Sequence, residues 1–229
     1  MHFRGFKRIE NLDKYTGCKS IWLDSNGFDK IENLTCLAEL RCLYLSKNLI
    51  GQIEGLDSLK HLTILDLSNN RLSMLENLSC CPSLQTLNVS HNALSSVESI
   101  QHLTSCSSLS TLDLTSNRLP ADEDIFTVLA SMPALVTLSL NGNEVTKLAN
   151  FRKRLIAKIG RLGYLDRPID ERERLCAEAY VAGGLEAEEL ARQDWKARQD
   201  AKRVKEMEDY KAWQAEHKRA REERRSATG

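Results

Sequence analysis

The fold of this chain is decided by the stretch Leu40–Asn70, LRCLYLSKNLIGQIEGLDSLKHLTILDLSNN, which contains one pattern twice. Each copy has three leucines followed by an asparagine, in the spacing L-x-x-L-x-L-x-x-N. Related copies extend in both directions, so the asparagine returns six times, at Asn26, Asn48, Asn70, Asn92, Asn117 and Asn143. The interval is constant from Asn26 to Asn92, and the last two intervals are longer. The chain is therefore built from repeats of one structural unit.

A period of 20–29 residues with this pattern is typical of leucine-rich repeats. The alternation Leu43-x-Leu45 predicts a short strand with one buried face. The later spacing of three, in Ile50, Ile53, Leu56 and Leu59, predicts a tight helical or 3₁₀ return. Because each unit buries its apolar face only against its neighbours, we expect an α/β solenoid. It is a right-handed superhelix with a curved parallel β-sheet on its concave face, a C-terminal cap and a helical extension.

The repeated asparagines have a structural explanation. A turn inside the stack leaves backbone N–H and C=O groups without partners, and burying such groups unpaired is costly. An inward amide offers both a donor and an acceptor. We therefore expect the six asparagines to form a ladder between neighbouring turns, and not a binding site.

The chain divides into four segments. Residues 1–17 form a degenerate N-terminal repeat or cap around Phe3, Phe6, Ile9 and Leu12, and residues 18–149 hold the repeats. Residues 150–170 form the C-terminal cap, a helix from Phe151 followed by a closing strand near Leu165. The longer intervals predict a fuller convex helix over Asp122–Met132. Residues 171–229 are a charged helical extension, which Gly183-Gly184 should interrupt to give a short helix, a hinge and a longer helix.

Composition excludes several functions. The 32 basic and 32 acidic residues cancel, so neither nucleic acid nor an anionic membrane is an expected partner. No stretch has the roughly 20 apolar residues of a membrane helix, and the first residues lack a signal-peptide core. The seven scattered cysteines are expected to be reduced thiols in the cytosol. We expect that the protein is not an enzyme. The sequence shows no nucleophile with an oxyanion donor and no phosphate-binding glycine loop. It also lacks metal-ligand spacing and a cofactor motif.

Strand residues that alternate with the inward leucines should line the concave face. One column of them runs Trp22, Tyr44, Asp66, Asn88 and Asp113, and Arg41, Ile64 and His91 are its neighbours. An aromatic pair followed by carboxylates is typical of a protein-binding hot spot with a polar continuation. The alternative is that Trp22 and Tyr44 only stack on each other and shield the strands.

Segments outside the repeat pattern carry a resemblance. The opening Phe3–Leu12 (FRGFKRIENL), Lys19–Leu34 (KSIWLDSNGFDKIENL) and the closing Gly163–Pro168 (GYLDRP) resemble the dynein axonemal assembly factor 1 family. More specific is Cys176–Trp195, CAEAYVAGGLEAEELARQDW, which follows no repeat logic and is similar to the segment after the cap in that family. The resemblance covers residues 2 to about 196.

The resemblance implies a non-enzymatic, cytoplasmic factor in the preassembly of dynein arms for cilia or flagella. Its partners would be axonemal dynein chains, other assembly factors and chaperones, and we expect a monomer. The repeats alone leave an alternative open: a structural subunit of another complex, such as an axonemal dynein light chain, a phosphatase regulator or a ribonucleoprotein component.

Overall fold

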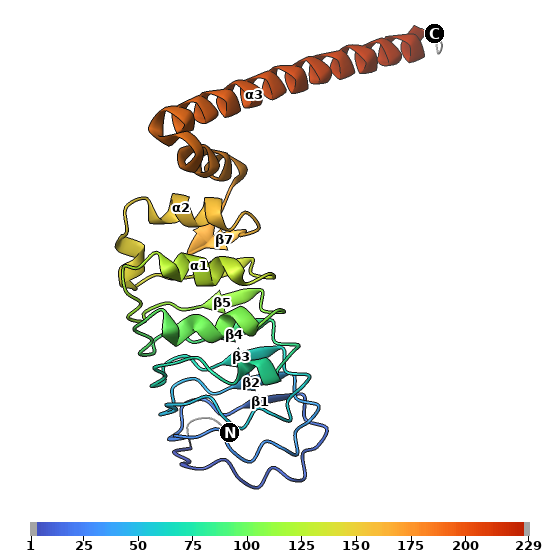
Figure 1. The fold of residues 1–229 in the computed structure, drawn as a ribbon. Coiled ribbons are helices and arrows are strands. Elements are labelled where there is room, and N and C mark those ends of the chain that lie inside the picture. The colour runs from blue at the N-terminus through green and yellow to red at the C-terminus, as the bar shows by residue number, and fades with distance from the viewer. Residues whose placement is uncertain (1–3, 227–229) are drawn as a thin grey trace. The chain divides into compact units, whose positions relative to one another are not determined.

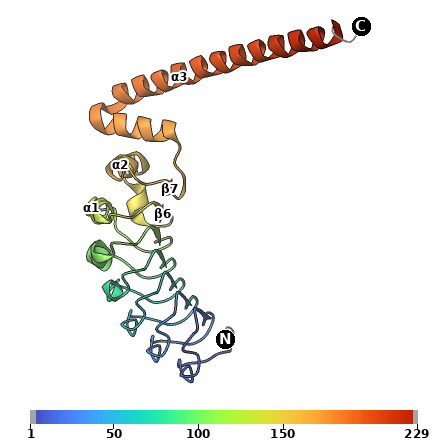
Figure 2. The same ribbon diagram turned by 90° about the vertical axis from the view of Figure 1, so that its right-hand side faces the viewer.

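The computed structural model describes residues 4–226, which form two compact units that divide between Asp170 and Glu171. In the first unit the repeats stack in chain order, with strands on one side and helical segments on the other (Figures 1 and 2). Phe3, which we assigned to the N-terminal unit, lies outside the described residues.

A parallel sheet runs the length of the stack. Seven strands follow one another in chain order, and a short strand then pairs antiparallel with the last of them. The strands are β1 (Ser20–Trp22), β2 (Cys42–Tyr44), β3 (Ile64–Asp66), β4 (Thr86–Asn88), β5 (Thr111–Asp113), β6 (Thr137–Ser139), β7 (Tyr164–Leu165) and β8 (Arg167–Pro168). From β2 to β6 the middle residue is a buried leucine, and the two flanking residues are half-buried. The predicted solenoid with a parallel sheet is confirmed.

The convex side becomes more helical along the chain. Its elements are η1 (Leu78–Cys80), η2 (Glu98–Ser105), α1 (Asp124–Ser131), η3 (Glu144–Lys147) and α2 (Phe151–Lys158). The prediction of a helix within Asp122–Met132 is confirmed by α1. The predicted helical return over Ile50–Leu59 is wrong, because this stretch forms turns and bends. The next repeat has the same length and holds only the three-residue η1, whereas the longer intervals that end at Asn117 and Asn143 hold the eight-residue η2 and α1.

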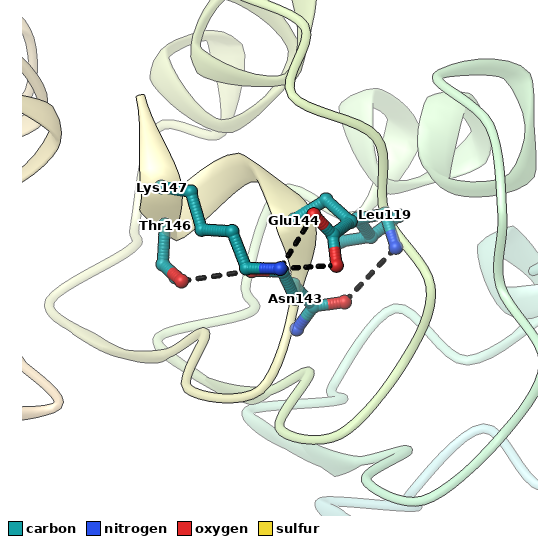
Figure 3. Close-up of polar contacts among 5 residues, drawn as sticks. All are labelled: Leu119, Asn143, Glu144, Thr146 and Lys147. Carbon is teal, nitrogen blue, oxygen red and sulfur yellow. Dashed lines mark hydrogen bonds and ion pairs between the residues drawn. The ribbon is translucent and has the colours of Figure 1, made fainter. Parts of the chain in front are cut away.

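Asparagine amides join neighbouring turns at the end of the strands. Asn48 Nδ2 donates to the Leu45 carbonyl of its own repeat at 2.9 Å and to the Leu23 carbonyl of the preceding repeat at 3.1 Å. Its Oδ1 accepts the Phe28 N–H at 3.2 Å. The bonds recur at Asn70, Asn92, Asn117 and Asn143. Figure 3 shows the last of these, in which Asn143 Oδ1 accepts the Leu119 N–H at 3.0 Å.

A second column of turns, which the sequence analysis missed, lies on the convex side. Asn11, Asn33, Gly55 and Asn77 all have left-handed backbone, with φ between 57° and 68°. Asn33 Nδ2 donates to the Ile9 carbonyl and Asn77 Nδ2 to the Ile53 carbonyl, both at 2.7 Å. The signal was present in the sequence, because the tripeptide Glu-Asn-Leu recurs once in each early repeat, with Gly55 once in place of asparagine.

The ends of the first unit are closed by different means. At the N-terminal end Ile9 and Leu12 are buried, whereas Phe6 is 46 % exposed. At the C-terminal end basic side chains join the cap to α1 and the residues that flank it: Arg154 pairs with Glu123, Lys158 Nζ donates to Thr127, and Arg161 donates to the carbonyls of Ala130 and Met132. The Arg154 guanidinium also holds the pKa of the Glu123 carboxyl below its usual value. These cations are therefore used to hold the cap.

The second unit is the helical segment α3 (Glu171–Ser226), which is two helices joined at a kink. Gly183 (φ −149°, ψ 18°) and Gly184 (φ 73°, ψ −155°) lie outside the helical region of backbone angles. The positive φ of Gly184 is a conformation that favours glycine. Within this unit the Glu188 carboxylate, which is 4 % exposed, accepts from Arg192 at 3.0 Å. The Arg172 guanidinium lies 5.8 Å from the centre of the Trp195 ring.

Candidate protein-binding face

The column predicted from the sequence lies on neighbouring strands in register. Trp22, Tyr44, Asp66, Asn88 and Asp113 are the last residues of β1 to β5, and each is the Cα partner of the next across the sheet. Because parallel strands are about 4.8 Å apart, these side chains form a continuous row on the face opposite the buried leucines.

The aromatic members of the row stack on each other. The ring centroids of Trp22 and Tyr44 are 5.3 Å apart with an interplanar angle of 7°, and Trp22 is 51 % exposed. Burial raises the pKa of the Tyr44 hydroxyl, and the neighbouring Cys42 and Asp66 raise it further by smaller amounts. The phenol therefore stays protonated at neutral pH and can donate a hydrogen bond. The stack assumed by the shielding alternative is present, yet half of the indole surface remains accessible to a partner.

The polar members of the row also shape their own turns, which the sequence analysis missed. Asp66 Oδ1 accepts the N–H of Ser68 at 2.9 Å, and Asp113 Oδ1 accepts the N–H of Thr115 at 2.9 Å. Asn88 Oδ1 accepts the N–H of Ser90 at 3.0 Å. A short Asp or Asn side chain commonly bonds the backbone two residues on, and this preference was a sequence signal for the role. The row therefore combines a local structural role with exposure to a partner.

The three neighbouring residues occupy different places. Ile64 is the first residue of β3 and is half-buried, and Arg41 is exposed immediately before β2. His91 lies beyond the end of β4, in a left-handed turn with φ 55°, and its N–H donates to the Thr115 carbonyl. Among residues 4–226 no hydrogen bond joins His91 to Asp113, so the strands do not bring these two side chains together as a catalytic pair.

Between residues 4 and 226, no group of three or more His, Cys, Asp or Glu side chains is placed to hold a metal ion. None of the helices in this range is long and apolar enough to cross a membrane. A cavity of about 180 Å³ lies near the N-terminal end, lined mainly by Phe6, Ile9, Leu12, Leu23 and Phe28, and the aromatic pair does not line it.

A leucine-rich repeat family model matches residues 58–194. The chain belongs to the leucine-rich repeat family. This repeat chain is 58 % identical over 229 residues to dynein axonemal assembly factor 1 of Mus musculus, covering 99 % of the chain and 35 % of that protein. It is 60 % identical over 204 residues to the Homo sapiens protein of the same name, covering 88 % of the chain and 28 % of that protein.

The resemblance stated from Phe3–Leu12, Lys19–Leu34 and Cys176–Trp195 is confirmed by these identities. The chain spans about a third of the length of the curated relatives it matches. Among solved structures, a chain of the Drosophila melanogaster SNF/U2A′ complex is similar to this repeat protein, with a TM-score of 0.52 and 29 % identity. That match covers 63 % of this chain and 82 % of the other.

Proposed function

We propose that this chain is a non-enzymatic protein-binding scaffold that acts in the cytoplasmic preassembly of axonemal dynein arms for cilia and flagella. The observation that carries the proposal is 58 % identity over 99 % of the chain to proteins named dynein axonemal assembly factor 1. The identity extends past the repeats into α3, so it is not explained by a repeat motif that many unrelated proteins share. Its partners on this proposal are axonemal dynein chains, other assembly factors and chaperones.

The row formed by Trp22, Tyr44, Asp66, Asn88 and Asp113, called the concave row below, supports a binding role for the first unit. Trp22 and Tyr44 offer a rigid aromatic surface, and large aromatic side chains lose little conformational entropy when a partner covers them. Asp66, Asn88 and Asp113 continue the row with polar groups already oriented by their turns. We propose this row, with Arg41, Ile64 and His91 at its margins, as the surface that holds a client.

The test is capture of dynein chains from ciliated cells. The tagged 229-residue chain would be precipitated from cytoplasmic extract and its partners identified by mass spectrometry, beside a Trp22→Ala/Tyr44→Ala variant. Met74→Ala is the matched control, because it removes a side chain that is 48 % exposed and lies outside the strand row. Dynein heavy or intermediate chains recovered with the wild type and the control, but lost with the double variant, support the function and the surface. Recovery of no dynein chain with the wild type refutes the function.

Thermal unfolding of the same variants separates binding from folding. Because the Trp22 side chain is half exposed, its removal should lower the midpoint only slightly. A large loss of stability would mean that the aromatic pair holds the sheet, which contradicts its assignment as a client surface.

A second candidate function is a structural subunit of another complex, such as an axonemal dynein light chain, a phosphatase regulator or a ribonucleoprotein component. The 29 % identity to a chain of a solved complex, SNF/U2A′, favours such a subunit role. A structural subunit co-sediments with its particle, whereas an assembly factor is recovered in the soluble cytoplasmic fraction. Co-sedimentation of the chain with RNA-containing particles, lost after ribonuclease treatment, would support this alternative over dynein assembly.

A further inference from the structure

Two carboxylates of the concave row carry negative charge that the chain does not neutralise. In the described part of the chain neither Asp66 nor Asp113 forms an ion pair. The exposed Arg41 precedes β2, the strand beside Asp66, yet it also forms no ion pair there. The basic residues Lys19 and Arg41 precede β1 and β2, whereas the two carboxylates stand at the ends of β3 and β5.

Each carboxylate is oriented before a partner arrives. One oxygen of Asp66 is fixed by the Ser68 N–H and one oxygen of Asp113 by the Thr115 N–H, both at 2.9 Å. The second oxygen of each group is not used by these bonds and can accept from a cation. Pre-oriented groups lose less side-chain freedom on binding, which strengthens association.

The surroundings of Asp66 fit a basic side chain with an apolar stem. Tyr44 is its partner in the neighbouring strand, and Trp22 stacks on Tyr44 one strand further away. Arginine and lysine place their methylene stems on apolar or aromatic surface while the charged end reaches a carboxylate. Asp113 lies two strands from Asp66, which is about 10 Å at the spacing of parallel strands.

We propose that the concave face binds a segment of a partner protein that presents two arginine or lysine side chains about 10 Å apart, one to Asp66 and one to Asp113. The proposal rests on the proposed function in one respect, namely that this face holds a protein client. Electrostatic complementarity gives the face its selectivity, because an acidic segment would place like charges against both carboxylates.

The chain contains its own isosteric control. Asn88 occupies the same row between the two carboxylates, and its Oδ1 makes the same turn bond to Ser90 N–H at 3.0 Å. Asp66→Asn/Asp113→Asn therefore removes two charges while keeping both turns, and Asn88→Asp adds a charge while keeping its turn. If the row served only to shape turns, all three substitutions would leave binding unchanged.

The experiment is fluorescence anisotropy with the full chain and a dye-labelled 12-residue peptide that has arginine at every third position in an alanine and glutamine background. In the polyproline II conformation, which has three residues per turn, residues i and i+3 lie on the same side of the peptide about 9 Å apart. We expect the double asparagine variant to bind this peptide about tenfold more weakly, and Asn88→Asp to bind it a few times more tightly. Raising the salt concentration to about 0.5 M should remove most of the difference, because exposed charges are then screened.

A second peptide, with glutamate in place of arginine, gives the opposing outcome. Equal binding of both peptides, or an unchanged affinity in the double asparagine variant, overturns the proposal. Dynein capture distinguishes the two proposals: if the asparagine variant loses the arginine peptide but still recovers dynein chains, the face recognises cations and dynein binds elsewhere. If wild type recovers no dynein while the peptide result holds, only the dynein function fails.

Discussion

Replacing Asn92 by alanine tests the amide ladder at a point where the contacts are complete. Asn92 is buried, and its Oδ1 accepts the Leu72 N–H at 2.9 Å. Its Nδ2 donates to the carbonyls of Leu67 and Val89, both at 3.0 Å. The Leu67 carbonyl also accepts from Asn70, and the Val89 carbonyl also accepts from Asn117, so both keep one partner in the variant.

The expected loss of stability depends on which backbone groups lose their last hydrogen-bond partner when Asn92 is replaced. The Leu72 N–H is left without a partner in a buried site, which costs about 1–3 kcal/mol. The two carbonyls lose one of two bonds, and each such bond contributes about 0.5–1 kcal/mol. Asn92→Ala should therefore lower the free energy of unfolding by about 2–5 kcal/mol. Gln52→Ala is the matched control, because it removes an exposed amide and should change stability by less than about 0.5 kcal/mol.

Urea denaturation followed by far-UV circular dichroism measures both variants. Because Trp195 and Trp213 lie in the second unit, they are replaced by phenylalanine, and the fluorescence of Trp22 should then give the same midpoint if the repeats unfold together. A loss below about 1 kcal/mol for Asn92→Ala would refute the reasoning, because it would mean that the Leu72 N–H finds water or another acceptor as soon as the amide is removed.

Three further predictions concern packing, backbone and thiol chemistry. Leu65→Ala should lower stability by about 2–5 kcal/mol in the same urea assay, because its side chain is fully buried; an unchanged midpoint would contradict the register. Gly55→Ala should cost about 2–4 kcal/mol, since φ is +68° and an added Cβ would lie 2.3 Å from the Ile31 carbonyl oxygen. Burial, with a contribution from the neighbouring Cys80, raises the pKa of Cys81 to about 12, so at pH 8 this thiol should resist iodoacetamide while the half-buried Cys18 reacts. Peptide mapping that found Cys81 alkylated as fast as Cys18 would contradict this.

The sequence predicted the features that depend on a repeated spacing. The inward leucines and the ladder asparagines recur at a regular interval, so the strand positions and their order followed directly from the alternation and the period. The convex helix α1 was also predictable, since Ile125, Leu129 and Met132 have helical spacing and the longer interval leaves room for it.

What could not be predicted depends on the sign of φ and on local hydrogen bonds. His91 was predicted to be a neighbour of the strand row because it stands shortly after Asn88, but β4 ends at Asn88 and His91 lies in a left-handed turn beyond it. The Asp66 and Asp113 side chains were assigned to a partner alone, although each also bonds its own turn. Likewise the return over Ile50–Leu59 has a helical spacing of apolar residues but forms turns and bends. The spacing of apolar residues predicts which side chains are buried, but it does not predict the backbone conformation between them.

The helix that follows Gly184 continues to Ser226, and an α-helix of that length is a rod of about 60 Å. Each residue removed from a helix shortens it and also rotates the residues beyond the deletion about the helix axis, which does not happen in a flexible linker. Removing seven residues would shorten it by about 10 Å and keep the far end on nearly the same face. Removing five would shorten it less but rotate the far end by about 140°. A function that depends on the orientation of the distal helix should therefore tolerate the longer deletion better than the shorter one.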